Sequence, residues 1–111
     1  MNIVKSVQIL KTVRIIQKMN KVERHEQICK YLTNLYERKN SDYNDSFGKS
    51  YKEYGMAMPC IRLEDKLNRL KALTVHNHKQ EILDENIRDT LEDLANYAIM
   101  TIIEMDIENE E

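Results

Sequence analysis

The sequence predicts an all-α domain, and three observations support this prediction. Only two glycines and one proline interrupt the 111 residues, while leucine, isoleucine, glutamate, lysine and arginine are abundant. Runs of alternating β-branched and aromatic residues, which would indicate strands, are missing. Apolar residues recur instead at helical spacing along most of the chain. We therefore expect a bundle-like domain of four to five helices.

The first helix is expected over residues 3 to 19, where apolar side chains recur at Ile3, Val7, Leu10 and Ile16. The first eighteen residues carry four basic side chains and no acidic one, so this helix is basic and amphipathic. Such a helix lies on a membrane in some proteins, but more often it packs on its own fold or on a sister subunit. We interpret residues 1–20 as an appendage to a domain that spans residues 21–105.

The second helix is expected from about Val22 to Lys39. Its inward-facing residues are predicted to be Ile28, Leu32, Leu35 and Tyr36. The following segment, residues 40–55, is rich in turn formers and predicts a loop with a short helix near residues 46–54. Gly55 is expected to end this short helix, and Phe47 and Tyr51, one turn apart, are expected in the core.

The fourth helix is predicted from Pro59 to Val75, because proline suits the first turn of a helix. Its core stripe is expected at Leu63, Leu67 and Leu70. A polar connector over residues 76–83 should lead to the last helix, with Asp84 as its N-cap. Residues 106–111 are acidic and are interpreted as a solvated tail.

The last helix, about residues 84–104, is the most apolar element. Its second half, Leu94 to Ile103, is apolar almost all the way round, which is typical of a helix packed on several sides. This is more apolar surface than one small domain easily covers, so the sequence predicts a dimer or larger homo-oligomer. One stripe of this helix is expected to form the core: Ile87, Leu91, Leu94, Ala95, Ala98 and Ile102.

Charge and cysteine content limit the classes of partner and compartment. The net charge of −2 gives no reason to expect nucleic-acid or membrane binding. Cys29 and Cys60 stand without CxxC spacing and are expected to be reduced thiols. No apolar run approaches the ~18–20 residues of a membrane span. We expect a soluble cytoplasmic protein with no membrane partner.

A second stripe of the last helix places Asp89 and Asp93 one turn apart, leading into Asn96, Tyr97 and Met100. Carboxylates at the edge of a core need a partner, either a cation or a metal ion. Glu64 or Asp65, from an antiparallel fourth helix, would complete a carboxylate site for Mg²⁺, the ion that usually accompanies nucleotide phosphates. The alternative is that these aspartates only serve the helix dipole, although Asp93 lies too far inside the helix for that.

Cations on the fourth helix are candidates for binding phosphate oxygens, together with Lys39. They are Arg62, Lys66 and Arg69. The alternative is a solvated face stabilised by pairs such as Asp65 with Arg69. The candidates for contacting a nucleotide base are Asp42, Tyr43, which is suited to stacking, and Tyr97. No nucleophile motif, glycine-rich phosphate loop or zinc-ligand spacing appears.

The chain carries a series of motifs: Lys39, Asp42-Tyr43, Phe47, Gly55, then Arg62-Leu63-x-Asp65-Lys66 with Arg69-Leu70, and Asp89-Thr90-Leu91-x-Asp93-Leu94-Ala95-Asn96-Tyr97-Ala98. Together they resemble the nucleotide modification associated domain 1 family, a small domain of bacteriophages and their Firmicute hosts. The resemblance covers roughly residues 21 to 105. It implies a deoxynucleotide or nucleotide ligand and a setting in a bacterial cell or a phage-infected host.

More distantly, the layout is similar to the all-α nucleoside triphosphate pyrophosphatases, the MazG-like and dimeric dUTPase group. Those enzymes pair an ExxE motif on one helix with an ExxD motif on another, bind Mg²⁺ and release pyrophosphate. Here Leu67 stands three residues after Glu64 in place of an acid, and Thr90 stands where the second motif begins. The metal ligands that this similarity implies are Glu64, Asp65, Asp89 and Asp93.

Three functions follow as alternatives from these resemblances and patterns. The first is a Mg²⁺-dependent, deoxynucleotide-handling protein, such as a pyrophosphatase-like hydrolase linked to phage nucleotide modification. The second is a non-catalytic module that binds or sequesters a nucleotide, which the missing ExxE acid favours. The third is a helical interaction protein whose charged stripes are solvated faces. Whether the chain is an enzyme stays open at this point.

Overall fold

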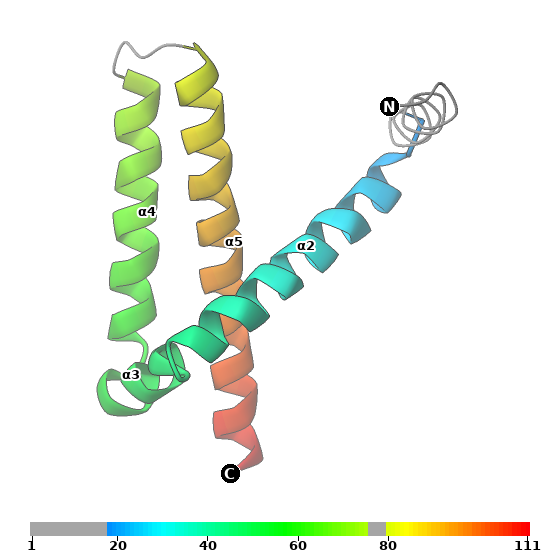
Figure 1. Ribbon diagram of the computed structural model, residues 1–111. Coiled ribbons are helices and arrows are strands. Elements are labelled where there is room, and N and C mark those ends of the chain that lie inside the picture. The colour runs from blue at the N-terminus through cyan, green and yellow to red at the C-terminus, as the bar shows by residue number, and fades with distance from the viewer. Residues whose placement is uncertain (1–17, 76–79) are drawn as a thin grey trace. The chain divides into compact units, whose positions relative to one another are not determined.

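The computed structural model describes residues 18–75 and 80–111, with the side chains of residues 80–85 excepted. This part of the chain forms helices and no strand, which confirms the predicted all-α class (Figure 1). The expected helix over residues 3 to 19 lies almost wholly outside the described residues. The helices are α2 (Lys21–Asp42), α3 (Ser46–Tyr54), α4 (Ala57–Val75) and α5 (Gln80–Glu110).

The chain divides into two units, with the boundary after Asn34. In the first unit, α2 begins with a reciprocal cap between Asn20 and Glu23. The Glu23 backbone N–H donates to Asn20 Oδ1 at 2.8 Å, and Asn20 Nδ2 donates to Glu23 Oε1 at 2.9 Å. This pair satisfies polar groups at the helix start and explains why α2 begins at Lys21. Leu32 is buried as expected, whereas Ile28 is 44% exposed, contrary to the prediction that it faces inward.

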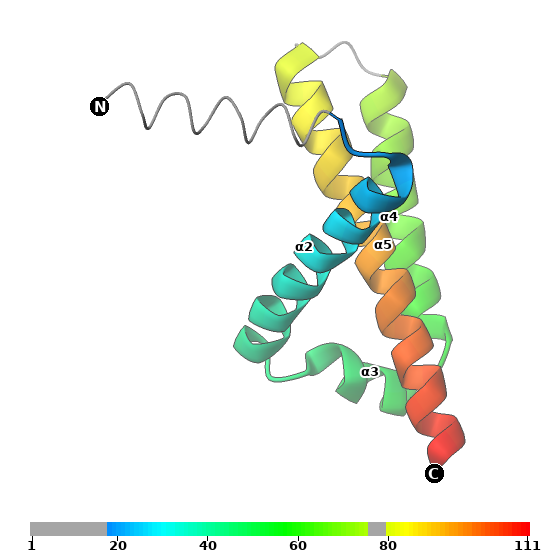
Figure 2. The same cartoon turned by 90° about the vertical axis from the view of Figure 1, so that its right-hand side faces the viewer.

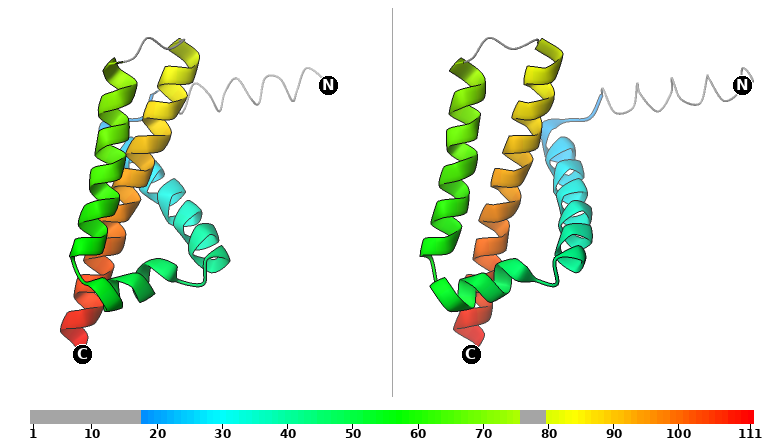
Figure 3. Two further views of the ribbon diagram at one scale, coloured as in Figure 1. Left: turned by 90° about the vertical axis from the view of Figure 1, so that its left-hand side faces the viewer. Right: turned by 60° about the vertical axis from the view of Figure 1, so that its left-hand side comes forward.

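In the second unit, α4 and α5 run side by side in opposite directions, and α3 lies at the end of this pair where α4 begins (Figures 2 and 3). Phe47 and Tyr51 of α3 form a buried cluster with Met58 of α4. Tyr97 and Met100 of α5 pack against this cluster. The prediction that Phe47 and Tyr51 belong to the core is therefore confirmed.

Left-handed backbone conformations separate α3 from its neighbours. Asn44 and Asp45 have φ values of 51° and 53°, in the turn that follows α2. Gly55, with φ 67° and ψ −153°, ends α3, and its N–H donates to the Tyr51 carbonyl oxygen at 2.7 Å. Because residues with a side chain rarely adopt this conformation, glycine at this position fixes the end of the helix. The expected role of Gly55 is confirmed.

Several predicted helix ends are wrong. Helix α2 continues to Asp42 instead of ending at Lys39, and α4 begins at Ala57. Helix α5 begins at Gln80, so Asp84 is not its N-cap. It continues to Glu110, so the acidic residues 106–111 are not a tail but almost entirely helix. The Tyr51 hydroxyl donates to Glu108 at 2.9 Å and attaches this last part of α5 to α3.

The predicted core stripe of α5 is wrong at Leu91, Ala98 and Ile102, which are exposed, whereas Ile87, Leu94 and Ala95 are half-buried. Leu91 and Ile102 are 48% and 58% exposed, whereas Thr90 and Thr101 are only 2% and 8% exposed. Each threonine hydroxyl donates to the backbone carbonyl oxygen four residues earlier, at 2.7 Å. A threonine that is satisfied on its own helix can be buried at little cost, and its small side chain allows close helix packing.

Helix α4 shows a similar difference. Leu67, predicted in the core, is 43% exposed, while Met58, Pro59 and Leu73 are buried. None of the helices in the described ranges is long and apolar enough to cross a membrane.

Candidate functional site

The second unit contains a cavity of about 410 Å³. It is lined by the last turns of α2, the start of α3, and residues of α4 and α5. The volume falls within the range of ~300–1,000 Å³ that is usual for small-molecule sites. This cavity brings together several of the charged and aromatic residues that the sequence indicated.

Aromatic side chains form one part of the lining: Tyr36, Tyr43, Phe47 and Tyr97. The Phe47 and Tyr97 rings are stacked, with their centroids 6.0 Å apart and an interplanar angle of 17°. Tyr43 is 68% exposed and therefore presents an accessible ring surface. Burial raises the pKa of Tyr36, and the nearby carboxylates of Asp45 and Glu104 raise it further. The lining thus offers apolar ring faces to a flat ligand.

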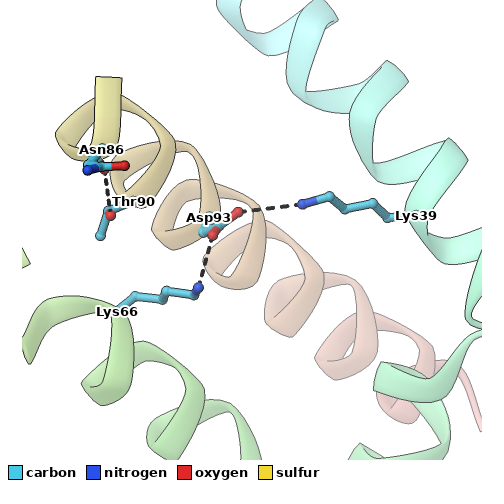
Figure 4. A network of polar contacts seen from close by, with 5 residues as sticks. All are labelled: Lys39, Lys66, Asn86, Thr90 and Asp93. Atoms are coloured by element: carbon cyan, nitrogen blue, oxygen red, sulfur yellow. Dashed lines mark hydrogen bonds and ion pairs between the residues drawn. The ribbon is translucent and has the colours of Figure 1, made fainter. Parts of the chain in front are cut away.

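Asp93 of α5 lies between two lysines from different helices (Figure 4). Its carboxylate oxygens lie 3.0 Å from Lys66 Nζ and 3.7 Å from Lys39 Nζ. Arg62 of α4 lines the same cavity as Asp93 and Lys39. The expectation that Asp93 needs a partner is met by cations, and the site combines three basic side chains with this one carboxylate.

The structure brings only part of the predicted site together. Lys39, Tyr43, Arg62, Asp93 and Tyr97 line the cavity, and Lys66 joins them through Asp93. The other predicted residues are exposed and do not line it: Asp42, Glu64, Asp65, Arg69 and Asp89.

The expected carboxylate cage is not assembled among the described residues. They contain no group of three or more His, Cys, Asp or Glu side chains that is placed to hold a metal ion. Of the four expected metal ligands, Asp93 is the one at the cavity. Asp89 lies one turn, about 6 Å, before Asp93 along α5, and it is exposed and does not line the cavity. Asp93 is therefore the carboxylate available to a ligand.

The burial of Thr90 explains in part why the cavity has no second carboxylate beside Asp93. Its side chain is 2% exposed, and its hydroxyl donates to the Asn86 carbonyl oxygen at 2.7 Å (Figure 4). Thr90 does not line the cavity. An acid at this position, where the pyrophosphatase motif begins, would be buried inside the unit and away from the cavity.

Six lining residues were not among the predicted site residues: Tyr36, Asn40, Ser46, Phe47, Asn96 and Met100. A signal for two of them was present, because Tyr36, Asn40 and Tyr43 are spaced as on one helix face. The Tyr43 N–H donates to the Lys39 carbonyl oxygen at 3.0 Å, so the helical hydrogen bonds continue to Tyr43. The sequence analysis ended the second helix at Lys39, and it therefore did not place Asn40 and Tyr43 on this helix face. On α5, the stripe of Asp93, Asn96, Tyr97 and Met100 lines the cavity.

The comparison with known protein families gives a match. A family model described as nucleotide modification associated domain 1 matches residues 39–105. This range contains every residue that lines the cavity except Tyr36. It starts later than residue 21, where the resemblance was expected to begin. Neither the curated proteins nor the solved structures gave a match. Because the matched range covers more than half of the sequence, the chain belongs to the nucleotide modification associated domain 1 family.

Proposed function

We propose that the cavity binds a nucleotide, with a phosphate on Lys39 and Arg62 and the base against the aromatic lining. The observation that carries this proposal is that one cavity combines these cations with aromatic side chains, among them the exposed ring of Tyr43. Cations bind phosphate oxygens by charge-assisted hydrogen bonds, and aromatic rings stack on bases. The family name, which refers to nucleotide modification, supports the same class of ligand.

The charges of the site favour a ligand with one phosphate group. Lys39, Arg62 and Lys66 together exceed the single carboxylate of Asp93 by two positive charges. A phosphate monoester carries a charge of about −1.5 to −2 at neutral pH, which matches this excess. A triphosphate carries more negative charge than these side chains neutralise, and so it requires an additional cation.

The lysines are available to such a ligand. The ion pairs of Asp93 are partly exposed, with side-chain exposures of 29% for Asp93 and Lys66 and 56% for Lys39. Exposed pairs of this kind contribute only ~0.2–1 kcal/mol. A phosphate group competes most easily for Lys39, whose ammonium lies at the longer distance of 3.7 Å.

Mg²⁺ fits this site through Asp93 and the phosphates of the ligand. Mg²⁺ commonly binds through one or two carboxylates together with phosphate oxygens, and it keeps several waters. When bound, it would neutralise phosphate charge and lower the pKa of a bound water. Glu64, Asp65 and Asp89 are exposed outside the cavity, so they do not add to this set. Binding is therefore the function that the geometry supports best.

Hydrolysis is the second candidate function, and the position of Asp93 beside the phosphate-binding cations favours it. In that version the chain is a Mg²⁺-dependent, pyrophosphatase-like hydrolase acting on deoxynucleotides. Phosphorus NMR of a deoxynucleoside triphosphate incubated with protein and Mg²⁺ separates the two versions. Release of pyrophosphate or phosphate supports hydrolysis, and an unchanged triphosphate supports binding or sequestration.

Thermal melting tests the binding proposal. The ligands are deoxynucleosides, their monophosphates and their triphosphates, each with Mg²⁺ and with a chelator. A ligand at about 100 times its dissociation constant stabilises the folded state by roughly 2.7 kcal/mol, which raises Tm by several degrees. We expect monophosphates to raise Tm with the chelator present, triphosphates to raise it only with Mg²⁺, and nucleosides to have little effect.

Matched variants locate the effect in the cavity. Arg62→Ala should reduce the Tm shift, whereas Arg69→Ala, on the same helix but outside the cavity, should keep it. Asp93→Asn should strengthen monophosphate binding, because it frees two lysines, and should abolish the effect of Mg²⁺ on triphosphates. If no nucleotide changes Tm under either condition, the helical interaction protein remains as the explanation.

A further inference from the structure

The two carboxylate oxygens of Asp93 have different lysine partners (Figure 4). Oδ2 lies 3.0 Å from Lys66 Nζ, close to the length of a charge-assisted hydrogen bond. Oδ1 lies 3.7 Å from Lys39 Nζ, which is too long for a hydrogen bond and leaves an electrostatic attraction only. Asp93 is therefore held mainly by Lys66.

The two lysines also differ in their relation to the cavity. Lys39, in the last turn of α2, lines the cavity, and its side chain is 56% exposed. Lys66, on α4, does not line the cavity, and its side chain is 29% exposed. A ligand in the cavity therefore reaches Lys39 directly, whereas its contact with Lys66 runs through Asp93.

Loss of Lys66 would leave one oxygen of Asp93 without a partner. The Asp93 side chain is 29% exposed, and a partly buried carboxylate costs free energy when no cation lies beside it. Lys39 is already 3.7 Å from Asp93, and its long side chain is flexible, so a small movement brings its ammonium to hydrogen-bond distance. The ammonium of Lys39 would then be engaged by Asp93 and less available to a phosphate.

We propose that Lys66 is a positioning residue of the cavity, which holds Asp93 and thereby keeps Lys39 available for the phosphate of the ligand. This inference rests on the proposed function, because that function assigns Lys39 to the phosphate. It makes the affinity depend on a side chain that the ligand does not touch. The positive charge of Lys66 also attracts an anion directly, and removal of the Asp93 carboxylate separates the two effects.

Isothermal titration calorimetry with each deoxynucleoside monophosphate, in the presence of a chelator, tests this proposal. Lys66→Met should raise the dissociation constant about tenfold in the natural chain, but less than about threefold in the Asp93→Asn chain, where no carboxylate competes for Lys39. Lys66→Arg should restore most of the affinity, since a guanidinium also binds a carboxylate. Lys71→Met removes one charge from an exposed position of the same helix, and as the matched control it should leave the affinity unchanged. Equal weakening by Lys66→Met in both chains would overturn the proposal.

Urea denaturation without ligand tests the same contact and separates it from nucleotide binding. A double-mutant cycle of Lys39→Met and Asp93→Asn measures the coupling between these two side chains. This coupling should be small in the natural chain and clearly larger in the Lys66→Met chain. An equal coupling in both chains contradicts the positioning role. If the coupling rises but no monophosphate binds the natural chain, the proposed function fails, and the role of Lys66 in holding Asp93 away from Lys39 is supported.

Discussion

At the scale of single residues, small polar side chains decide which face of α5 is buried. Thr90 and Thr101 are buried because each hydroxyl is satisfied within the helix. If burial is predicted from hydrophobicity alone, Leu91 and Ile102 are expected to be buried before these threonines, and the wrong face of α5 is assigned to the core. Four residues of the second stripe that the sequence indicated, Asp93, Asn96, Tyr97 and Met100, line the cavity, whereas Asp89 and Ile103 do not. A carboxylate followed by an aromatic residue at helical spacing differs from a plain core pattern, and this difference indicated the stripe.

Replacing Thr90 with an acid should destabilise the fold, although the pyrophosphatase motif has an acid there. Thr90→Asp places a carboxylate at a position that is 2% exposed, and we expect a loss of more than about 2 kcal/mol in the free energy of unfolding. Thr90→Val keeps the shape and should change it by less than about 1 kcal/mol. Urea denaturation measures both variants. Equal stability of the two would mean that position 90 is not buried.

Glu104 provides a prediction about pH. Burial raises its pKa above the ordinary 4.5, and Asp45 adds to this effect, while Lys52 opposes it. A raised pKa in the folded state means that the protonated form stabilises the fold, and this stability is lost as pH rises through the raised value. Glu104→Gln should therefore raise Tm at neutral pH, and the gain should disappear below about pH 4.5, where Glu104 is protonated in both states.

The control for this prediction is Glu53→Gln, on an exposed position of α3. It should leave the dependence of Tm on pH unchanged. A gain for Glu104→Gln that is the same at acidic and neutral pH would show that the charge of Glu104 is not its cause.

At the scale of elements, the helices themselves were predictable and their ends were less so. Gly55 gave a reliable end for α3, because its backbone conformation is nearly restricted to glycine. The acidic residues after Glu104 gave no such signal, since glutamates are good helix formers and also occur in solvated tails. The contact from Tyr51 to Glu108 that attaches them joins residues far apart in sequence, and no local pattern shows it.

Gly55→Ala should destabilise the fold through the backbone alone. A Cβ at this position meets no atom within 4 Å, so no steric clash contributes. The cost of holding alanine at φ 67° is about 1–3 kcal/mol. Chemical denaturation should show this loss, whereas Lys52→Ala, exposed on the same helix, should change stability by no more than about 0.5 kcal/mol. An unchanged Gly55→Ala would mean that the turn readily adopts another conformation.

At the scale of the whole molecule, α5 serves two surfaces with one helix. Asp93, Asn96 and Tyr97 contribute to the cavity, and Leu91, Ala98 and Ile102 face away from it. Ala98 and Ile102 belong to the segment from Leu94 to Ile103 that the sequence analysis interpreted as oligomerisation, and this interpretation stays a prediction. Which of the predicted metal ligands would lie at the cavity was harder to predict, because the positions of Asp65 and Asp89 relative to the cavity depend on how α4 and α5 pack.

The cavity also has an optical consequence. The chain has no tryptophan and six tyrosines, and three of these, Tyr36, Tyr43 and Tyr97, line the cavity. Half of the intrinsic emitters of the protein therefore lie where a bound base would stack. Quenching of tyrosine fluorescence gives a label-free titration of the site, and the tyrosines outside it provide an internal reference.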